Sequence, residues 1–182
     1  MTQIGIGEKA HNFVFASPWD GKKDFFTETK NQRSLLLFLR YFGCTTCQLE
    51  IHNLILDYPK FKQAGVEVYV VLQSSAATIT SELKQEDIPF VLVLDPEQTL
   101  YKAYGIGSRD PDNGRTLEHQ ARVQTAKTLG FTHGKYEGNE LQLPATFIIG
   151  PEHIVEYAYY GKESSDIPEH NVLIKKIGDA LA

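Results

Sequence analysis

The chain has 182 residues, of which 42% are hydrophobic and 23% charged, with a net charge of -5. This composition is typical of a soluble globular protein, and the length favours one domain, residues 1–182, over two. The acidic balance and the scattered lysines and arginines argue against a nucleic-acid partner. The longest apolar run, Leu35 to Leu39, is too short to cross a bilayer, so we expect no membrane partner.

The first eight residues contain neither a basic stretch nor a long apolar run, and so lack the pattern of a secretory signal. We therefore expect a cytoplasmic protein, in which cysteines are normally reduced. A close cysteine pair in that setting is more often catalytic or metal-binding than structural.

Apolar patterning predicts the elements in chain order. Continuous apolar runs indicate strands that are covered on both faces, and apolar residues at helical spacing indicate helices. We expect strands at 13–15, 35–41, 66–72, 90–94, 146–149 and 153–160, and helices at 45–63, 80–85, 97–104, 116–129 and 171–181. In the helix at 45–63, Pro59 should produce a kink or an end, and Gly65 should cap it.

Helices that alternate with buried strands predict an α/β fold with a central sheet and helices on both faces. The last two strands form a hairpin, so the sheet should be mixed rather than wholly parallel. Residues 107–140 break the alternation and are interpreted as an insertion. Loops this long are often functional; the sequence leaves open whether this one covers the active site, binds a partner or forms a dimer contact.

Both cysteines of the chain, Cys44 and Cys47, lie in one cluster directly after the strand at 35–41 and Gly43. If the next segment is helical, Cys44 lies at its N-terminus, where free N–H groups and the helix dipole stabilise a thiolate. Two thiolates supply only half of a tetrahedral zinc shell, and only a distant His119 or His133 could add to it. We therefore expect a redox dithiol and no metal, with two structural thiols as the alternative.

Three motifs carry a family resemblance: residues 42–47 (FGCTTC), 94–96 (LDP) and 143–149 (LPATFII). Together they resemble the thioredoxin superfamily, in particular its peroxiredoxin-like (AhpC/TSA) family and the C-x-x-C peroxiredoxin-like-2 and selenoprotein-L-like branch. The resemblance implies a thioredoxin-like fold with the insertion before a cis-proline strand. It also implies that Pro144 is that cis-proline and lies near Thr46 and Cys47.

The chain departs from the peroxidatic motif P-x-x-x-T-x-x-C of true peroxiredoxins. With the motif placed on Cys47, Arg40 stands in place of the proline and Cys44 in place of the threonine. Pro144 occupies the place of the arginine that orients the peroxide in that family. These losses weaken a peroxidase interpretation, although Arg40 could supply a cation beside the thiolate. Pro144, Thr46 and Arg40 are our candidate substrate-positioning residues.

We predict a thiol-disulfide oxidoreductase in which an exposed Cys44 thiolate attacks and the less exposed Cys47 resolves. No cofactor is expected, the substrate is a disulfide or a peroxide, and a thioredoxin-type or low-molecular-weight thiol donor recycles the dithiol. Two alternatives stay open: a thiol peroxidase with Cys47 or Cys44 as the peroxidatic residue, and a non-catalytic sensor or binding scaffold. Glu50, one turn past Cys47, is expected to be a solvated helix residue. Homodimer formation is left open.

Overall fold

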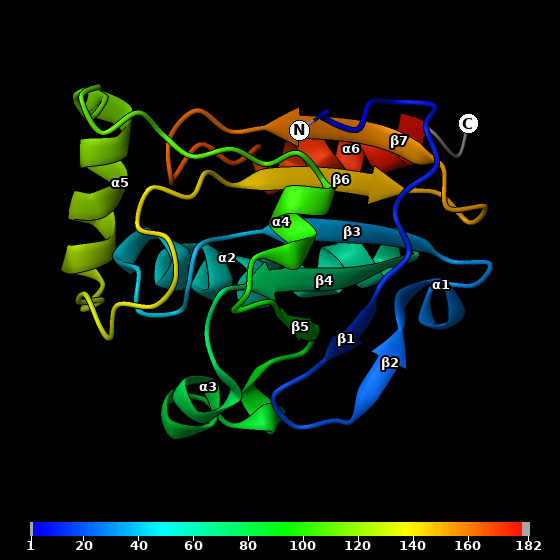
Figure 1. Ribbon diagram of the computed structural model, residues 1–182, viewed down its shortest axis with the longest axis horizontal. Coiled ribbons are helices and arrows are strands. Elements are labelled where there is room, and N and C mark those ends of the chain that lie inside the picture. Colours follow the sequence, from blue (N-terminus) through cyan, green and yellow to red (C-terminus); the bar gives the residue numbers. More distant parts are fainter. Residues whose placement is uncertain (1, 180–182) are drawn as a thin grey trace.

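A five-stranded sheet organises the computed structural model, which describes residues 2–179 (Figure 1). The strand order is β5-β4-β3-β6-β7, with β3 parallel to β4, β4 parallel to β5, and β6 antiparallel to both β3 and β7. The strands are β3 (Arg33–Phe38), β4 (Val66–Leu72), β5 (Val91–Leu94), β6 (Ala145–Ile149) and β7 (Val155–Tyr160). The mixed sheet predicted from the closing hairpin is confirmed.

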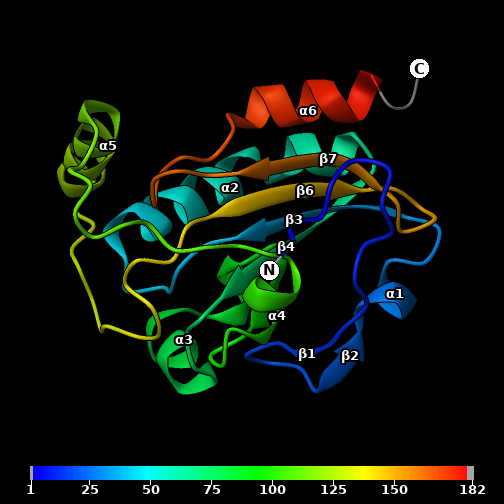
Figure 2. The same ribbon diagram turned by 45° about the horizontal axis from the view of Figure 1, so that its top comes forward.

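Helices cover both faces of this sheet, as predicted (Figure 2). The long helix α2 (Thr45–Gln63) and α6 (His170–Asp179) pack on one face. The other face carries α4 (Thr99–Ala103), α1 (Phe25–Glu28) and a small hairpin of β1 (Val14–Ala16) and β2 (Lys22–Asp24). The remaining helices are α3 (Ala76–Glu82), the 3-10 turn η1 (Gln85–Asp87) and α5 (Leu117–Thr128).

The apolar side chains of β3 pack in two hydrophobic cores, one on each face of the sheet. Leu35 and Leu37 pack in the core beneath α2 and α6, whereas Leu36 and Phe38 pack in the core on the opposite face. Successive side chains of a strand point to opposite faces, so a strand covered on both faces must be apolar throughout. This places β3 at the centre of the fold, with β4 and β6 as its neighbours.

Most predicted elements lie where the pattern placed them, and α2 and β4 have the predicted bounds. The helix expected at 80–85 is instead α3, which begins earlier because Ser75 caps it by accepting from the N–H of Thr78. The short elements β2 and α1 were not predicted. The last two residues of the helix expected at 171–181 lie outside the described part of the chain.

Pro59, expected to kink or end α2, does not end it, because the helix continues through it to Gln63. Proline removes one helix hydrogen bond. Leu54 before it and Phe61 after it are both fully buried in the same core, and this burial holds the helix together across Pro59.

The expectation of a cis peptide bond at Pro144 is also wrong, because no peptide bond among residues 2–179 is cis. The trans form is intrinsically preferred by about 0.5–1 kcal/mol for a bond that precedes proline. The carbonyl of Pro144 accepts from the N–H of Gly161 at 3.0 Å. The proline ring packs so closely there that a Cβ on Gly161 would lie 2.7 Å from Pro144 Cγ.

Within residues 2–179, none of the helices combines the length and the apolar content that crossing a bilayer would require.

Phe147 should be a major contributor to stability. Its ring is fully buried in β6 and contacts the rings of Phe38, Tyr104 and Tyr160. Replacing it with alanine should lower the free energy of unfolding by roughly 3–5 kcal/mol, measured by urea denaturation. The control Val14→Ala, at a side chain that is 63% exposed, should change it by less than about 0.5 kcal/mol. Equal effects would contradict the packing described.

Candidate active site

The central strand β3 leads directly into the dithiol. After β3 the chain runs through residues 39–43, and α2 begins with Cys44 as its N-cap in an extended conformation. The carbonyl of Cys44 accepts from the N–H of Gln48 at 2.9 Å, which closes the first helical turn. The predicted position of Cys44 at the helix start is confirmed.

Arg40 and Thr46 both contact the sulfur of Cys44. Arg40 Nη2 donates to Cys44 Sγ at 2.9 Å, and Thr46 Oγ1 lies 3.3 Å from the same atom. The backbone of Arg40 is fixed by the N–H of Gln73, which donates to its carbonyl at 2.8 Å. The guanidinium is buried as well. A charged donor held in place in this way is a strong stabiliser of an anion.

The two cysteines have opposite pKa shifts. A hydrogen bond from the Cys47 thiol is the largest cause that lowers the pKa of Cys44, and it is aided by the charge of Arg40 and by Thr46 against the opposing effect of burial. Burial raises the pKa of Cys47, and its bond to the Cys44 anion raises it further. The arrangement therefore places the negative charge on Cys44 and the proton on Cys47.

The expectation that Cys44 is exposed is wrong. Cys44 is 0% exposed and Cys47 is 1% exposed. The cover comes from residues 131–142, the end of the insertion and the two residues after it, which we call the covering segment. Gly134 donates its N–H to the carbonyl of Gly43 at 2.8 Å, and Gln48 Nε2 donates to the carbonyl of Thr132 at 2.8 Å. The sequence showed that this segment breaks the alternation, but not where it lies.

Gly43 is required by the closeness of this cover. A Cβ at that position would lie 2.2 Å from the carbonyl oxygen of Lys135, which no side chain tolerates. Next to it, the hydroxyl of Tyr41 and Nε2 of His133 lie 2.9 Å apart. The covering segment therefore passes directly over the turn that precedes the dithiol.

Pro144 lies at the same end of the sheet as the dithiol, beside the last residue of β3. Ala145 is paired with Phe38 in the antiparallel register of β6 and β3, so the residue before Ala145 lies beside the end of β3 that leads into the dithiol. The structure thus brings Arg40, Thr46 and Cys44 into contact and places Pro144 at their edge of the sheet. The substrate-positioning roles of these residues stay predictions.

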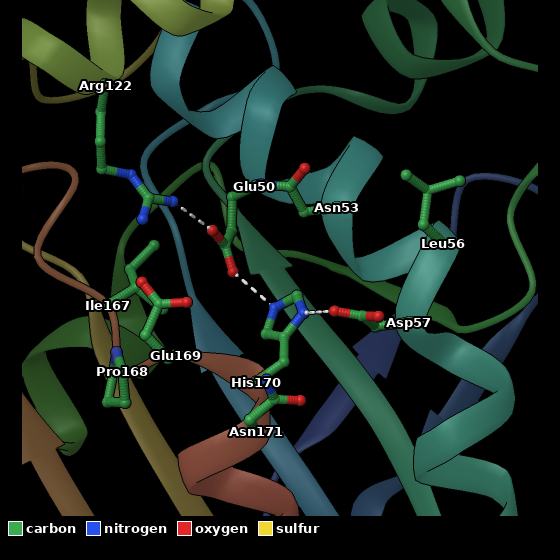
Figure 3. Close-up of a pocket in the computed structure, with 10 residues that line it drawn as sticks. All are labelled: Glu50, Asn53, Leu56, Asp57, Arg122, Ile167, Pro168, Glu169, His170 and Asn171. Carbon is green, nitrogen blue, oxygen red and sulfur yellow. Dashed lines mark hydrogen bonds and ion pairs between the residues drawn. The ribbon is translucent and has the colours of Figure 1, made fainter.

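Glu50 is not solvated as expected, since its residue is only 2% exposed. Its carboxylate accepts from Arg122 Nη2 of α5 at 2.8 Å and lies 2.9 Å from Nε2 of His170, whose Nδ1 lies 2.8 Å from Asp57 (Figure 3). These four side chains line a cavity of about 170 Å³. The helical spacing of Cys47, Glu50 and Leu54 places Glu50 on the buried face of α2, a signal that the sequence contained.

The histidines that could have completed a metal shell are used elsewhere. His133 bonds to Tyr41, and His119 Nδ1 lies 2.9 Å from Ser165 Oγ. Among residues 2–179, no group of three or more histidine, cysteine, aspartate or glutamate side chains is arranged to hold a metal ion.

A mixed sheet covered on both faces, with two cysteines at the start of the helix that follows its central strand, defines a thioredoxin-fold dithiol protein. The family model of the AhpC/TSA family matches residues 6–158. The chain belongs to the AhpC/TSA family.

Individual relatives agree with this assignment. The thiol-disulfide oxidoreductase ResA of Bacillus thuringiensis subsp. konkukian is 31% identical over 107 residues, 57% of this chain and 60% of that protein. Peroxiredoxin-like 2C of Bos taurus is 22% identical over 158 residues, 82% of this chain and 69% of that protein. A peroxiredoxin 6 mutant of Arenicola marina has a similar fold, with a TM-score of 0.71, 21% identity, and coverage of 98% of this chain and 74% of that chain.

Removal of the Arg40 charge should raise the pKa of Cys44. The variant Arg40→Gln keeps a hydrogen-bond donor but loses the cation that stabilises the thiolate. The absorbance of the thiolate, titrated against pH in a Cys47→Ser background, measures the change. Arg109→Gln is the control, because the guanidinium of Arg109 donates to the carbonyls of Asp110 and Asn113 in its own loop, away from the dithiol. An unchanged Cys44 pKa in Arg40→Gln would contradict the site described.

His170 should stabilise the fold more at low pH than at high pH. Burial opposes its charge, but Glu50 and Asp57 outweigh that effect and raise its pKa above 6.5. A raised folded-state pKa gives stability that is fully present below about 6.5 and is lost as pH rises through the folded value. His170→Gln should therefore lower the free energy of unfolding by roughly 1.5–3 kcal/mol near pH 6, with a smaller loss at alkaline pH. A loss that is the same at both pH values would contradict a charged His170.

Proposed function

We propose that this protein is a thiol-disulfide oxidoreductase that cycles between a Cys44/Cys47 dithiol and a disulfide. The observation that carries the proposal is the contact of Arg40 Nη2 with Cys44 Sγ at the first turn of α2. A thiolate, not a thiol, is the nucleophile in disulfide exchange. The lowered pKa of Cys44 and the raised pKa of Cys47 support Cys44 as the attacking residue.

The cycle follows from this asymmetry. The Cys44 thiolate attacks one sulfur of a disulfide R–S–S–R, forms a mixed disulfide and releases one R–S⁻, which takes a proton from solvent. Cys47 then loses its proton and attacks the Cys44 sulfur, which releases the second R–S⁻. The substrate has gained two electrons, and the protein holds a Cys44–Cys47 disulfide. An external thiol donor, a thioredoxin-type protein or a low-molecular-weight thiol, returns the two electrons.

Arg40 has one task in this cycle. Before the attack it holds the thiolate of Cys44 in place, and formation of the disulfide removes that anion. Thr46 donates a further hydrogen bond to the same sulfur. Pro144, at the neighbouring end of β6, is the proposed wall against which the substrate disulfide lies. A reducing compartment such as the cytosol is the setting we propose for this cycle.

A thiol peroxidase is the second candidate, and one observation favours it. Arg40 and Thr46 flank Cys44 with two donors, which is the kind of preorganised site that stabilises charge as an O–O bond breaks. In this case Cys44 would be the peroxidatic residue, because the pKa of Cys47 is raised. Stopped-flow rates with hydrogen peroxide and with 2-hydroxyethyl disulfide rank the two candidates. A peroxide rate far above the disulfide rate would favour the peroxidase.

Single cysteine variants should separate the two roles. With 2-hydroxyethyl disulfide, the wild type should lose two hydrogen atoms by mass, a change that dithiothreitol reverses. Cys47→Ser should stop at the mixed disulfide, because the resolving thiol is gone. Cys44→Ser should react more slowly than the wild type by on the order of a hundredfold, since thiolate fraction controls the rate. Equal rates for Cys44→Ser and wild type would contradict the assigned roles, and two inert thiols would leave only the scaffold interpretation.

A further inference from the structure

The guanidinium of Arg40 donates hydrogen bonds both to the dithiol and to the covering segment. Arg40 Nη2 donates to Cys44 Sγ, while Nη1 donates to the backbone carbonyl of Glu140 in the covering segment. The carboxylate of Glu140 lies 3.9 Å from the same Nη1. The side chain of Arg40 is only 9% exposed, so its charge depends on these partners rather than on water.

The rest of the covering segment is held mainly by polar contacts rather than by buried apolar side chains. It has no helix or strand within residues 131–140, and most of its residues are exposed. Glu137 accepts from Thr78 Oγ1 at 2.8 Å, and the N–H of Asn139 donates to Gln73 at 2.6 Å. Gly130 and Gly138 have positive φ angles of 89° and 63°, so the chain turns sharply before the segment and within it. Segments with few buried apolar contacts open at low free energy.

We propose that residues 131–142 are a lid whose closure depends on the redox state of the dithiol, with Arg40 as the positioning residue that links the two. The inference rests on the proposed function, because it needs the Cys44–Cys47 disulfide to form. In the reduced protein the Cys44 thiolate neutralises the Arg40 guanidinium and holds it where it reaches Glu140.

Oxidation removes that anion. When 2-hydroxyethyl disulfide oxidises the site, a Cys44–Cys47 bond forms, the S–S bond of the reagent breaks, and two molecules of its thiol leave with the proton of Cys47 and one from solvent. Both protein sulfurs are then uncharged. The half-exposed carboxylate of Glu140, 3.9 Å from Nη1, is then the anion left beside the guanidinium. A buried cation that has lost its closest counter-ion is strongly disfavoured. The guanidinium therefore follows this carboxylate towards water, and its bond to the backbone carbonyl of Glu140 is lost.

The lid also selects reaction partners. While the lid is closed over the reduced dithiol, Cys44 is fully buried. A small local movement of the lid is enough to admit a small oxidant, whereas a protein disulfide can reach Cys44 only when the whole segment moves away. Once the site is oxidised, the open lid admits a large reductant to the disulfide. The lid thereby favours a small oxidising substrate and a protein-sized reducing partner.

Amide hydrogen exchange followed by mass spectrometry tests the link. Residues 131–142, which include the bonded N–H groups of Gly134 and Asn139, should exchange on the order of tenfold faster in the oxidised protein than in the reduced one, the effect of losing one charge-assisted hydrogen bond. In reductant, Cys47→Ser keeps the thiolate and should stay protected, whereas Cys44→Ser should exchange as fast as the oxidised wild type.

A second variant tests partner selection without any change at the dithiol. Glu137→Ala removes the bonds that tie the lid to Ser75 and Thr78. It should raise the rate at which the reduced protein reacts with insulin by several-fold, and leave the rate with hydrogen peroxide within about twofold. Glu86→Ala, an exposed acidic residue on the η1 turn, is the matched control and should change neither rate.

The outcomes separate this inference from the proposed function. Equal exchange of residues 131–142 in both redox states, with the disulfide verified by mass, would overturn the lid and leave the dithiol cycle intact. A failure of the disulfide to form would overturn the cycle and the lid together. Equal acceleration of the insulin and peroxide reactions in Glu137→Ala would overturn the partner selection.

Discussion

The structure depends on a negative charge held inside the protein. A thiolate at Cys44, which is 0% exposed, is tolerable only with a compensating cation and donors at short distance. Arg40 supplies the cation at 2.9 Å, and the first turn of α2 supplies Thr46 and the Cys47 thiol. The negative charge that makes Cys44 reactive therefore requires the donors Arg40 and Thr46 around the buried sulfur.

The fold meets that requirement by joining elements from distant parts of the chain. The register of β3 with β4 and β6 fixes the end of β3, from which Arg40 and the dithiol follow. The insertion contacts this region at two places. Arg122 of its helix α5 pairs with Glu50 of α2, and its residues Gly134 and Lys135 lie over Gly43. The ion pair of α5 and the cover of the dithiol therefore belong to one continuous segment anchored on α2.

The sequence predicted the architecture well because the strands are buried on both faces, and their apolar runs leave little choice of element. The spacing of the cysteines after β3 likewise predicted a helix start at Cys44. Other features depend on contacts between residues far apart in sequence. Arg40 is an example. The sequence offered it as a cation beside the thiolate, but nothing in its neighbours shows that the same guanidinium reaches a carbonyl 100 positions away.

Glu50 is a different case, because its spacing from Cys47 and Leu54 indicated the buried face, but a carboxylate is expected there only with partners. Those partners, Arg122 and His170, lie on α5 and α6. The exposure expected for Cys44 was wrong for the same reason, since the cover comes from the insertion. Local patterns predict elements, whereas the pairing of charges depends on the assembled fold.

The central claim is that the thiolate resides on Cys44 rather than on Cys47. The most direct measurement is the rate at which iodoacetamide modifies each cysteine of the reduced wild type as a function of pH, with the modified residue located by peptide mass spectrometry. The account predicts that Cys44 reacts first, with a rate that reaches its plateau well below the ordinary thiol pKa of about 8.5, while Cys47 stays unmodified. Modification of Cys47 first, or of both residues with one ordinary thiol pKa, would contradict it.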